Sequence, residues 1–235
     1  MRGARNGQTS AMSTRFVDLS HVVSDGLRTY PGLPSPEISD HLARAHAEEV
    51  YGPGNTFQIG MITMCANTGT YLDVPFHRYA DGYDLCGLDL LRVSHVPAVL
   101  VDARGETAIG PERFARLDLA GTAVLVRTDH SDRWGTEAYF EDHPHLTGAA
   151  AEALVAAGVA CVGIDSLNID STTDGARPVH SILLRAGIPI VEHLTGLDAL
   201  PRDAFTFTAV PPKVEGMGTF TVRAHAVVPD GGGRP

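Results

Sequence analysis

The run from Asn67 to Arg78 constrains the fold of this chain more than any other stretch. It reads Asn-Thr-Gly-Thr-Tyr-Leu-Asp-Val-Pro-Phe-His-Arg and contains two residues that restrict the backbone. Gly69 permits a backbone geometry closed to other residues, whereas Pro75 fixes φ and lacks an N–H donor. An ordinary helix is therefore excluded, and we expect an extended segment that leads into a turn.

An extended chain places every second side chain on the same face. If this alternation continues from Tyr71 through Asp73 and Pro75 to His77, it brings together a phenol, a carboxylate and an imidazole. These are the groups that acid–base catalysis uses. The alternative is a structural strand in which Asp73 caps a turn and His77 is a hydrogen-bonded core residue. The catalytic interpretation requires further polar groups that converge from elsewhere in the chain.

A second group of polar residues lies in the C-terminal half. Glu192 interrupts the apolar run Ile188–Leu194, and a carboxylate in a buried strand is costly unless it is paired, protonated or bound to a metal. A salt bridge with Arg185 is the alternative structural explanation. His180 opens a short helical turn. The segment 164–170 follows an apolar strand, at the end where active sites of open α/β sheets gather.

The run from Asn67 to Arg78 resembles the signature of the putative cyclase family, which includes bacterial kynurenine formamidases and related metal-dependent amide and ring hydrolases. Asn67 and Tyr71 replace two histidines that are metal ligands in that family. Four other signature positions are matched, by Gly69, Asp73, Pro75 and His77. The resemblance extends from about residue 16 to residue 228.

The resemblance implies a set of site residues. The family brings a His and then a Glu to its metal centre, and His180 and Glu192 follow that order and spacing, twelve residues apart. The implied metal ligands are Asp73, His180 and Glu192, if a metal is retained. Tyr30 and Pro31 match an aromatic-Pro-Gly loop near the substrate pocket. The implied catalytic residues are Asn67, Tyr71, Asp73, His77, His180 and Glu192.

The resemblance also implies the fold, an α/β swivelling β/β/α sandwich with mixed sheets and flanking helices, assembled as homodimers or homotetramers. We expect a disordered extension over residues 1–13, one cyclase-like domain over 14–228 and a flexible tail over 229–235. The first ten residues lack the apolar core of a signal peptide. Translation from Met1 and from Met12 both remain open.

Local patterns agree with α/β layering. The segment 147–158 starts with Thr147, is rich in alanine and ends with Gly158, which predicts a capped helix. The continuously apolar stretch that follows predicts a strand buried on both faces. Further strands are expected at 16–21, 57–64, 98–101, 123–126, 159–164 and 188–192, with a closing antiparallel pair at 205–210 and 219–228.

Charge and cysteine content narrow the functional classes. The net charge is −10, from 18 basic and 28 acidic residues, which argues against nucleic acid or an anionic membrane surface as a partner. No apolar run is long enough to span a bilayer. Cys65, Cys86 and Cys161 are widely spaced and odd in number, a pattern that favours reduced thiols in the cytoplasm.

Three functions follow as hypotheses. The first is a hydrolase of the arylformamidase or cyclic-amide type, which opens a C–N bond of a small carbonyl or amide substrate. The second is a metal-independent cyclase or dehydratase centred on His77 and the nearby carboxylates. The third is a non-catalytic binding protein, disfavoured because four costly polar groups remain. For the cofactor, we expect either none or one weakly bound zinc or manganese ion.

Overall fold

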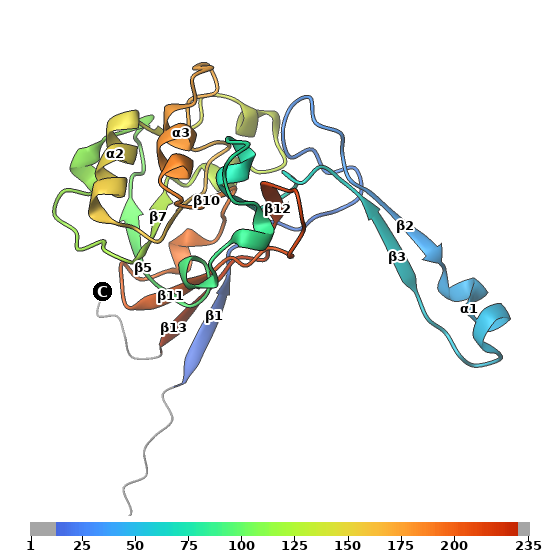
Figure 1. Cartoon of the computed structure of the whole chain (residues 1–235). Coiled ribbons are helices and arrows are strands. Elements are labelled where there is room, and N and C mark those ends of the chain that lie inside the picture. Colours follow the sequence, from blue (N-terminus) through green and yellow to red (C-terminus); the bar gives the residue numbers. More distant parts are fainter. Residues whose placement is uncertain (1–12, 230–235) are drawn as a thin grey trace, which may run out of the picture.

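The computed structural model describes residues 13–229, which form a rounded body and a long projecting arm (Figure 1). The body is built on a nine-stranded mixed sheet in the order β1-β13-β11-β5-β7-β9-β10-β4-β12. The strands are β1 Thr14–Asp18, β4 Tyr71–Asp73, β5 Val96–Asp102, β7 Ala123–Arg127, β9 Cys161–Ile164, β10 Ile190–Glu192, β11 Phe205–Thr208, β12 Thr219–Thr221 and β13 His225–Pro229. This is the mixed α/β architecture that the sequence predicts.

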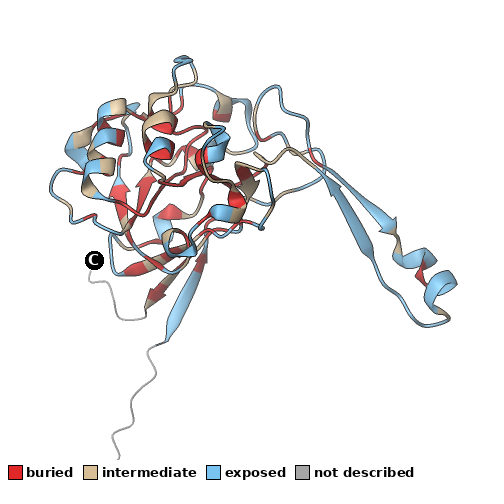
Figure 2. Cartoon of the chain, viewed as in Figure 1, coloured by how far each residue is buried: buried red, intermediate tan, exposed pale blue. Residues whose placement is uncertain are grey.

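The centre of the sheet is parallel. Strand β7 pairs with β5 on one side and β9 on the other, and β9 pairs with β10. All four residues of β9 are buried, as expected for a strand covered on both faces. Helices α2 Gly148–Ala157 and α3 Pro178–Arg185 cover one face (Figure 1). A second cluster of buried apolar side chains, which includes Leu72, Leu125 and Phe207, packs on the other face. Figure 2 shows that the strands of the body are largely buried.

Helix α2 has the ends that its sequence predicts. The Thr147 side chain accepts a hydrogen bond from the Ala150 N–H, which satisfies one of the free donors of the first turn. Gly158 ends the helix in the left-handed conformation, at φ 70° and ψ 40°. Two short-range signals thus define this helix without any tertiary contact.

The Asn67–Arg78 run leaves the extended conformation sooner than expected. Strand β4 lies between β10 and β12 and ends at Asp73. Pro75 then occupies the first position of a 3₁₀ turn, η1 Pro75–His77. The predicted alternation through His77 is therefore wrong, because the fixed φ of Pro75 favours the start of a helical turn over a continuing strand.

The C-terminal segment also differs from the prediction. The predicted strand 219–228 is two strands, because the chain turns between Thr221 and His225. Strand β13 pairs with β11 as expected, whereas β12 crosses the sheet and pairs with β4. Pro229 belongs to β13, one residue inside the predicted tail. The expected extension lies outside the described residues up to residue 12, as does the tail from residue 230.

The arm consists of β2 Glu37–Leu42, α1 Arg44–Tyr51 and β3 Ile59–Thr63. The sequence predicts β3, but β2 and α1 were not expected. Strands β2 and β3 form a separate antiparallel ribbon that no other strand joins. Nearly the whole arm is exposed, and in its helix only Ala47 is buried (Figure 2).

The remaining elements are short and lie around the body. Strands β6 Ala108–Ile109 and β8 His145–Leu146 form a small parallel pair. The 3₁₀ turns after η1 are η2 Leu85–Gly87, η3 Leu90–Arg92, η4 Pro111–Arg113, η5 His130–Arg133, η6 Glu137–Phe140 and η7 Leu197–Ala199. Over residues 13–229, the helices are too short or too polar to traverse a bilayer.

Candidate active site

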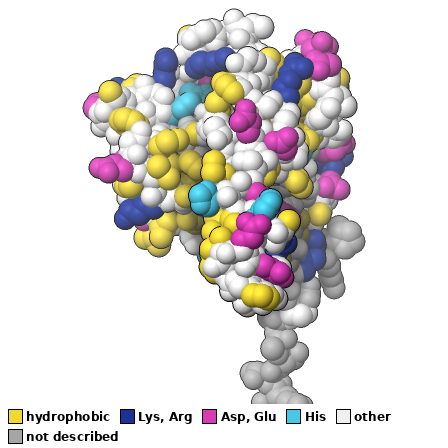
Figure 3. All heavy atoms as spheres, turned by 90° about the vertical axis from the view of Figure 1, so that its right-hand side faces the viewer, with side chains coloured by type: hydrophobic (Ala, Val, Ile, Leu, Met, Phe, Trp, Pro, Cys, Tyr) yellow, Lys and Arg dark blue, Asp and Glu magenta, His cyan; other side chains and the backbone are white. Residues whose placement is uncertain are grey.

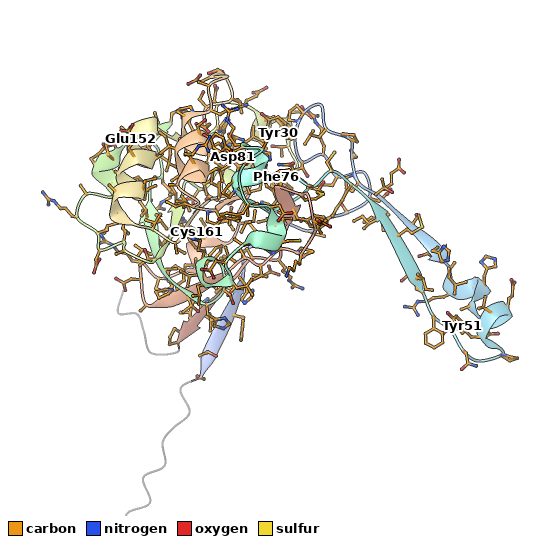
Figure 4. The ribbon with its side chains drawn as sticks, in the orientation of Figure 1. Tyr30, Tyr51, Phe76, Asp81, Glu152 and Cys161 are labelled. Atoms are coloured by element: carbon orange, nitrogen blue, oxygen red, sulfur yellow. The ribbon has the colours of Figure 1, made fainter. Side chains whose placement is uncertain are left out.

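A cavity of about 360 Å³ opens over β4, β10 and the start of α3. Tyr30 and Phe76 of η1 lie on the same side of the body, near the base of the arm (Figure 4). The cavity is lined by Tyr30, Leu33, Asn67, Tyr71, His77, Arg78, Asn168, Arg177, His180 and Glu192. Both predicted halves of the site therefore meet here, because β4 and β10 are neighbours in the sheet.

His77 is connected to Asp73 through a third residue, Thr219 of β12. The Thr219 hydroxyl donates a short hydrogen bond to Asp73 Oδ1. It therefore accepts at the same oxygen from His77 Nδ1, at 2.8 Å. This arrangement places the imidazole proton on Nδ1 and leaves Nε2 of His77 free to accept one. Since the His77 side chain is 37% exposed, Nε2 can act on a bound molecule as a general base.

His180 is held by Asp170, a residue the sequence did not single out. Asp170 accepts the backbone N–H groups of Val179 and His180 at 2.7 and 2.9 Å, which caps α3. The same carboxylate contacts His180 Nδ1 at 2.7 Å. His180 Nε2 consequently faces the cavity floor, 3.7 Å from Asp73 Oδ2 and 3.7 Å from Glu192 Oε1.

The charges of the floor depend on one another. Burial lowers the pKa of His180, but the Glu192 carboxylate, Asp170 and Asp73 outweigh it and raise this pKa to about 10. Burial favours a neutral Asp73, yet His77, His180 and Thr219 lower its pKa below the ordinary value. Burial, reinforced by Asp73, raises the pKa of Glu192.

Both oxygens of Glu192 are occupied by donors from the protein. Oε2 accepts the Tyr71 hydroxyl at 2.6 Å, and Oε1 accepts the Ile169 N–H at 2.6 Å. Burial, together with Glu192 and Asp73, raises the pKa of Tyr71 well above its ordinary value, so the phenol remains a donor. The alternative pairing of Glu192 with Arg185 is wrong, because Arg185 pairs with Asp81 at 3.2 Å.

The residues present fit a single metal ion. Asp73, His77 and His180 each offer one ligand atom, and these atoms lie within 4.8 Å of one another. Asp73 Oδ2 is buried without a hydrogen-bond partner, which is costly unless a cation or a donor occupies the space it faces. Two imidazoles and a carboxylate suit zinc, iron or manganese. The ligand set implied by the sequence resemblance is Asp73, His180 and Glu192. The set that the structure brings together has His77 in place of Glu192.

The structure places the other predicted residues as follows. Asn67 lines the cavity and interacts with the Tyr71 hydroxyl. Tyr30 lines it as well, whereas the neighbouring proline Pro31 is not a lining residue. The sequence analysis assigned no role to several residues of the site, among them Asn168, Asp170 and Thr219. Asn168 and Asp170 lie in segment 164–170, where the sequence analysis expects active-site residues. No sequence pattern around Thr219 indicates a role in the site.

A family model described as "Putative cyclase" matches residues 17–171 of this chain. The chain is 29% identical to a kynurenine formamidase of Bacillus cereus over 215 residues, which cover 90% of this chain and 97% of that relative. A kynurenine formamidase of Geobacillus thermodenitrificans is also 29% identical, with 91% and 97% of the two chains covered.

Solved structures share the fold. A crystal structure of an isatin hydrolase bound to the product analogue thioisatinate matches with a TM-score of 0.79 at 24% identity, and the match covers 92% of this chain and 93% of that one. Isatin hydrolase A from Ralstonia solanacearum matches with a TM-score of 0.76 at 25% identity, with 92% of each chain covered. These likenesses cover 92% of this chain.

Proposed function

The chain belongs to the putative cyclase family, and from this premise we propose that it is a small-molecule hydrolase that opens the C–N bond of a formamide or cyclic amide. The observation that carries the proposal is the Asp73–Thr219–His77 arrangement at the edge of a cavity whose floor holds His180 and Glu192. The kynurenine formamidase relatives support the class of substrate. We set aside the non-catalytic binding hypothesis.

His77 supplies the base in this proposal. Its free Nε2 removes a proton from the attacking water, and the imidazolium formed is stabilised through Thr219 by the buried Asp73. The same nitrogen then returns the proton to the leaving amine. In this proposal Asp73 and His180 would hold a divalent ion, and His77 would act as the base and not as a third ligand. The ion would lower the pKa of the attacking water and polarise the carbonyl.

Amide side chains serve the developing oxyanion. Asn168 Oδ1 already accepts the Asp170 N–H at 3.0 Å, so its NH₂ group is left to donate into the cavity. Asn67 provides a second amide on the wall beside Tyr71. A donor of this kind contributes on the order of 3 kcal/mol to transition-state stabilisation. The loss of two family histidines therefore leaves a site rich in neutral donors.

One observation favours a second candidate, metal-independent cyclisation or dehydration. The raised pKa of His180 makes it an imidazolium beside Asp73 and Glu192, so the protein can balance the buried carboxylates by itself. An imidazolium and a general base whose rings lie 6.0 Å apart, centroid to centroid, can transfer protons on a carbonyl compound without an ion. Metal content separates the two candidates.

The deciding experiment combines elemental analysis with turnover. We expect purified protein to contain about one zinc or manganese ion per chain and to hydrolyse N-formylkynurenine or isatin. Dipicolinate should remove the ion and the activity, and added metal should restore both. His77→Ala should lose activity by a factor of about 10² to 10⁴ while retaining the metal bound by Asp73 and His180. Metal-free protein without hydrolysis would leave the second candidate standing.

The proposed assembly is a homodimer or homotetramer in which the arm contacts a second copy. A two-stranded ribbon is marginal on its own in water, and this one exposes hydrophobic side chains on both faces. Figure 3 looks onto the arm and shows hydrophobic side chains beside acidic and histidine side chains. The exposed hydrophobic residues of the arm are Ile38, Val50, Tyr51, Phe57, Ile59, Met61 and Ile62.

We propose the cytoplasm as the location and a small molecule, not a nucleic acid or a membrane, as the partner. Cys65, Cys86 and Cys161 are free thiols, as a reducing compartment allows. Burial raises the pKa of Cys161 to about 12, which keeps this thiol protonated and unreactive.

A further inference from the structure

Two arginines, Arg78 and Arg177, line the cavity. Arg78 is exposed and Arg177 half-buried, whereas the floor residues His180 and Glu192 are buried, so we call the position of the arginines the mouth of the cavity. Arg78 directly follows η1, which carries His77, and Arg177 is the residue before Pro178, where the helix that carries His180 begins. Both arginines line the same cavity as the two histidines. They come from segments a hundred residues apart, which the fold brings together at one edge.

Neither guanidinium has a carboxylate within ion-pair distance in residues 13–229. Arg78 donates two long hydrogen bonds, from Nε to Ser181 Oγ at 3.3 Å and from Nη2 to the Ala176 carbonyl at 3.4 Å. Arg177 donates from Nη1 to the Ser171 carbonyl at 2.7 Å. These neutral acceptors hold both side chains but leave their charges uncompensated.

The absence of acidic partners is notable in a chain with a net charge of −10. Six other arginines of the described chain lie against a carboxylate: Arg28, Arg104, Arg113, Arg127, Arg185 and Arg223. A cavity with carboxylates on its floor and two free guanidinium groups at its mouth has a fixed polarity. This polarity orients a bound molecule so that its negatively charged end lies at the arginines and away from the carboxylates.

We propose that Arg78 and Arg177 form a carboxylate subsite, so that the substrate carries a carboxylate at the end remote from the C–N bond that is cleaved. A guanidinium binds a carboxylate through two parallel hydrogen bonds, which fixes orientation as well as charge. The remote carboxylate at the mouth then places the amide carbonyl between His77 and His180. Tyr30 and Leu33 supply an aromatic and an apolar contact along the same cavity.

This inference rests on the proposed hydrolase function and is tested with three probes that share one scissile bond. Formanilide is neutral, whereas 3-formamidobenzoate and 4-formamidobenzoate carry a carboxylate on the ring. We expect kcat/KM to be roughly tenfold or more higher for at least one carboxylated probe, through KM. The preference should decrease as sodium chloride rises from low to high concentration, because the arginines are partly exposed.

Variants assign the preference to the two residues. Arg78→Met and Arg177→Gln should each lower kcat/KM on the preferred carboxylated probe about tenfold and leave formanilide unchanged. Arg177→Lys should restore part of the preference if charge is what matters. Arg185→Met is the matched control, because Arg185 stacks on Tyr79 and pairs with Asp81 outside the cavity. Arg185→Met should leave kcat/KM unchanged for both the carboxylated probe and formanilide.

The outcomes separate the two proposals. Equal turnover of all three probes, with Arg78→Met behaving like the parent protein, overturns the carboxylate subsite and leaves the hydrolase function intact. No turnover of any formamide or of isatin contradicts the hydrolase function. Calorimetric binding then tests the subsite directly: tighter binding of 3-formamidobenzoate than of formanilide, lost in Arg78→Met, supports it, and equal binding overturns it.

Discussion

Thr219 determines which nitrogen of His77 carries the proton. Its hydroxyl has one hydrogen and gives it to Asp73, so the contact with His77 Nδ1 requires an N–H on the ring. Without this hydroxyl, both tautomers of the imidazole become accessible and the buried Asp73 loses a donor. Thr219 is therefore a positioning residue that acts through His77.

We predict that Thr219→Val lowers kcat by a factor of about ten to a hundred with a smaller change in KM. Thr219→Ser should retain most of the rate, because it keeps the hydroxyl. The measurement is a pH profile of kcat for the two variants, in which the valine variant should show a displaced acidic limb, because His77 must be unprotonated to act as the base. An unchanged profile in Thr219→Val would assign the residue a purely structural role.

Tyr71 is a donor that a buried carboxylate depends on. Removing its hydroxyl in Tyr71→Phe leaves Glu192 Oε2 without a partner at a position that is 1% exposed. We expect the free energy of unfolding to fall by about 1–3 kcal/mol, the cost of an unsatisfied buried group. Chemical denaturation at pH 7 measures this loss.

The matched control is Tyr83→Phe. The Tyr83 hydroxyl donates to the Gly187 carbonyl at 2.9 Å in a partly exposed position, where water can replace it. Its loss should therefore cost less than 1 kcal/mol. Equal losses in the two variants would mean that the Tyr71–Glu192 contact has no special role in the floor of the cavity.

At the scale of elements, strand β12 must approach η1 closely to bring Thr219 to His77. Gly218 makes this possible: a Cβ atom there would lie 2.2 Å from the His77 backbone nitrogen and 2.5 Å from its Cα. The Gly218 carbonyl also accepts the Val74 N–H at 2.8 Å. A side chain at this position forces the strand and the 3₁₀ turn apart.

Gly218→Ala should therefore reduce activity at least tenfold and lower the free energy of unfolding by roughly 1–3 kcal/mol, because backbone must shift to relieve the overlap. Gly175→Ala is the control, since its added Cβ would meet nothing within 4 Å and its φ is not in the left-handed region. Both quantities can be measured on the same preparations. Normal activity in Gly218→Ala would show that β12 can withdraw without disturbing His77.

At the scale of the whole molecule, several buried histidines couple folding to pH. Burial lowers the pKa of His21 and of His143 to about 4, and that of His193 to about 3. In the unfolded chain these groups titrate near pH 6.5, so the unfolded state binds more protons below that pH. The folded state therefore loses stability as the pH falls from 6.5 toward 4.

Asp165 acts in the opposite sense. Burial raises its pKa to about 6, so the folded state binds this proton more tightly than the unfolded state and gains stability as the pH falls from 6 toward 4. Each group contributes at most about 1.4 kcal/mol per pH unit while it titrates. Burial also lowers the pKa of His130 and raises that of Glu192, so the lowered histidines outnumber the raised carboxyl groups and falling pH causes a net loss of stability.

Guanidinium denaturation between pH 7 and pH 5 should show this loss. His143→Gln removes one titrating group and should reduce the slope by about 1.4 kcal/mol per pH unit. A free energy of unfolding that stays constant from pH 7 to pH 5 would contradict neutral, buried histidines in the folded state.

The proposed assembly depends on the arm. Ile38 pairs with Ile62 across the ribbon, so the two side chains share one face, and Tyr51 lies at the far end of the arm (Figure 4). The double variant Ile38→Lys, Ile62→Lys should convert the proposed oligomer to monomers, because burying two charges in an apolar contact is costly. Light scattering coupled to size-exclusion chromatography measures the mass.

The control for the arm is Leu91→Lys, which changes a side chain that is 82% exposed on the body. It should leave the mass unchanged. A parent protein that is already monomeric at micromolar concentration would contradict the proposed role of the arm.

The sequence alone determined the elements whose signals are local. Thr147 and Gly158 delimit α2 because capping depends on neighbouring residues only. The apolar run of β9 predicted a strand covered on both faces, and with it the α/β class. Asp73, His77, His180 and Glu192 were predicted as site residues. A carboxylate within an apolar run is costly, which pointed to Glu192, and all four residues match positions of the family that the sequence resembles.

The tertiary structure decided the rest, because it depends on contacts between distant segments. Thr219 joins His77 only through the pairing of β12 with β4, and no pattern around residue 219 indicates this. Strand β2 and helix α1 of the arm were not predicted, because exposed elements lack the periodic burial on which such predictions rely. Arg78 and Arg177 become neighbours of one cavity only when η1 packs beside α3. The sequence determines local features such as helix caps and buried strands. Contacts between residues that are distant in the sequence depend on how the backbone folds.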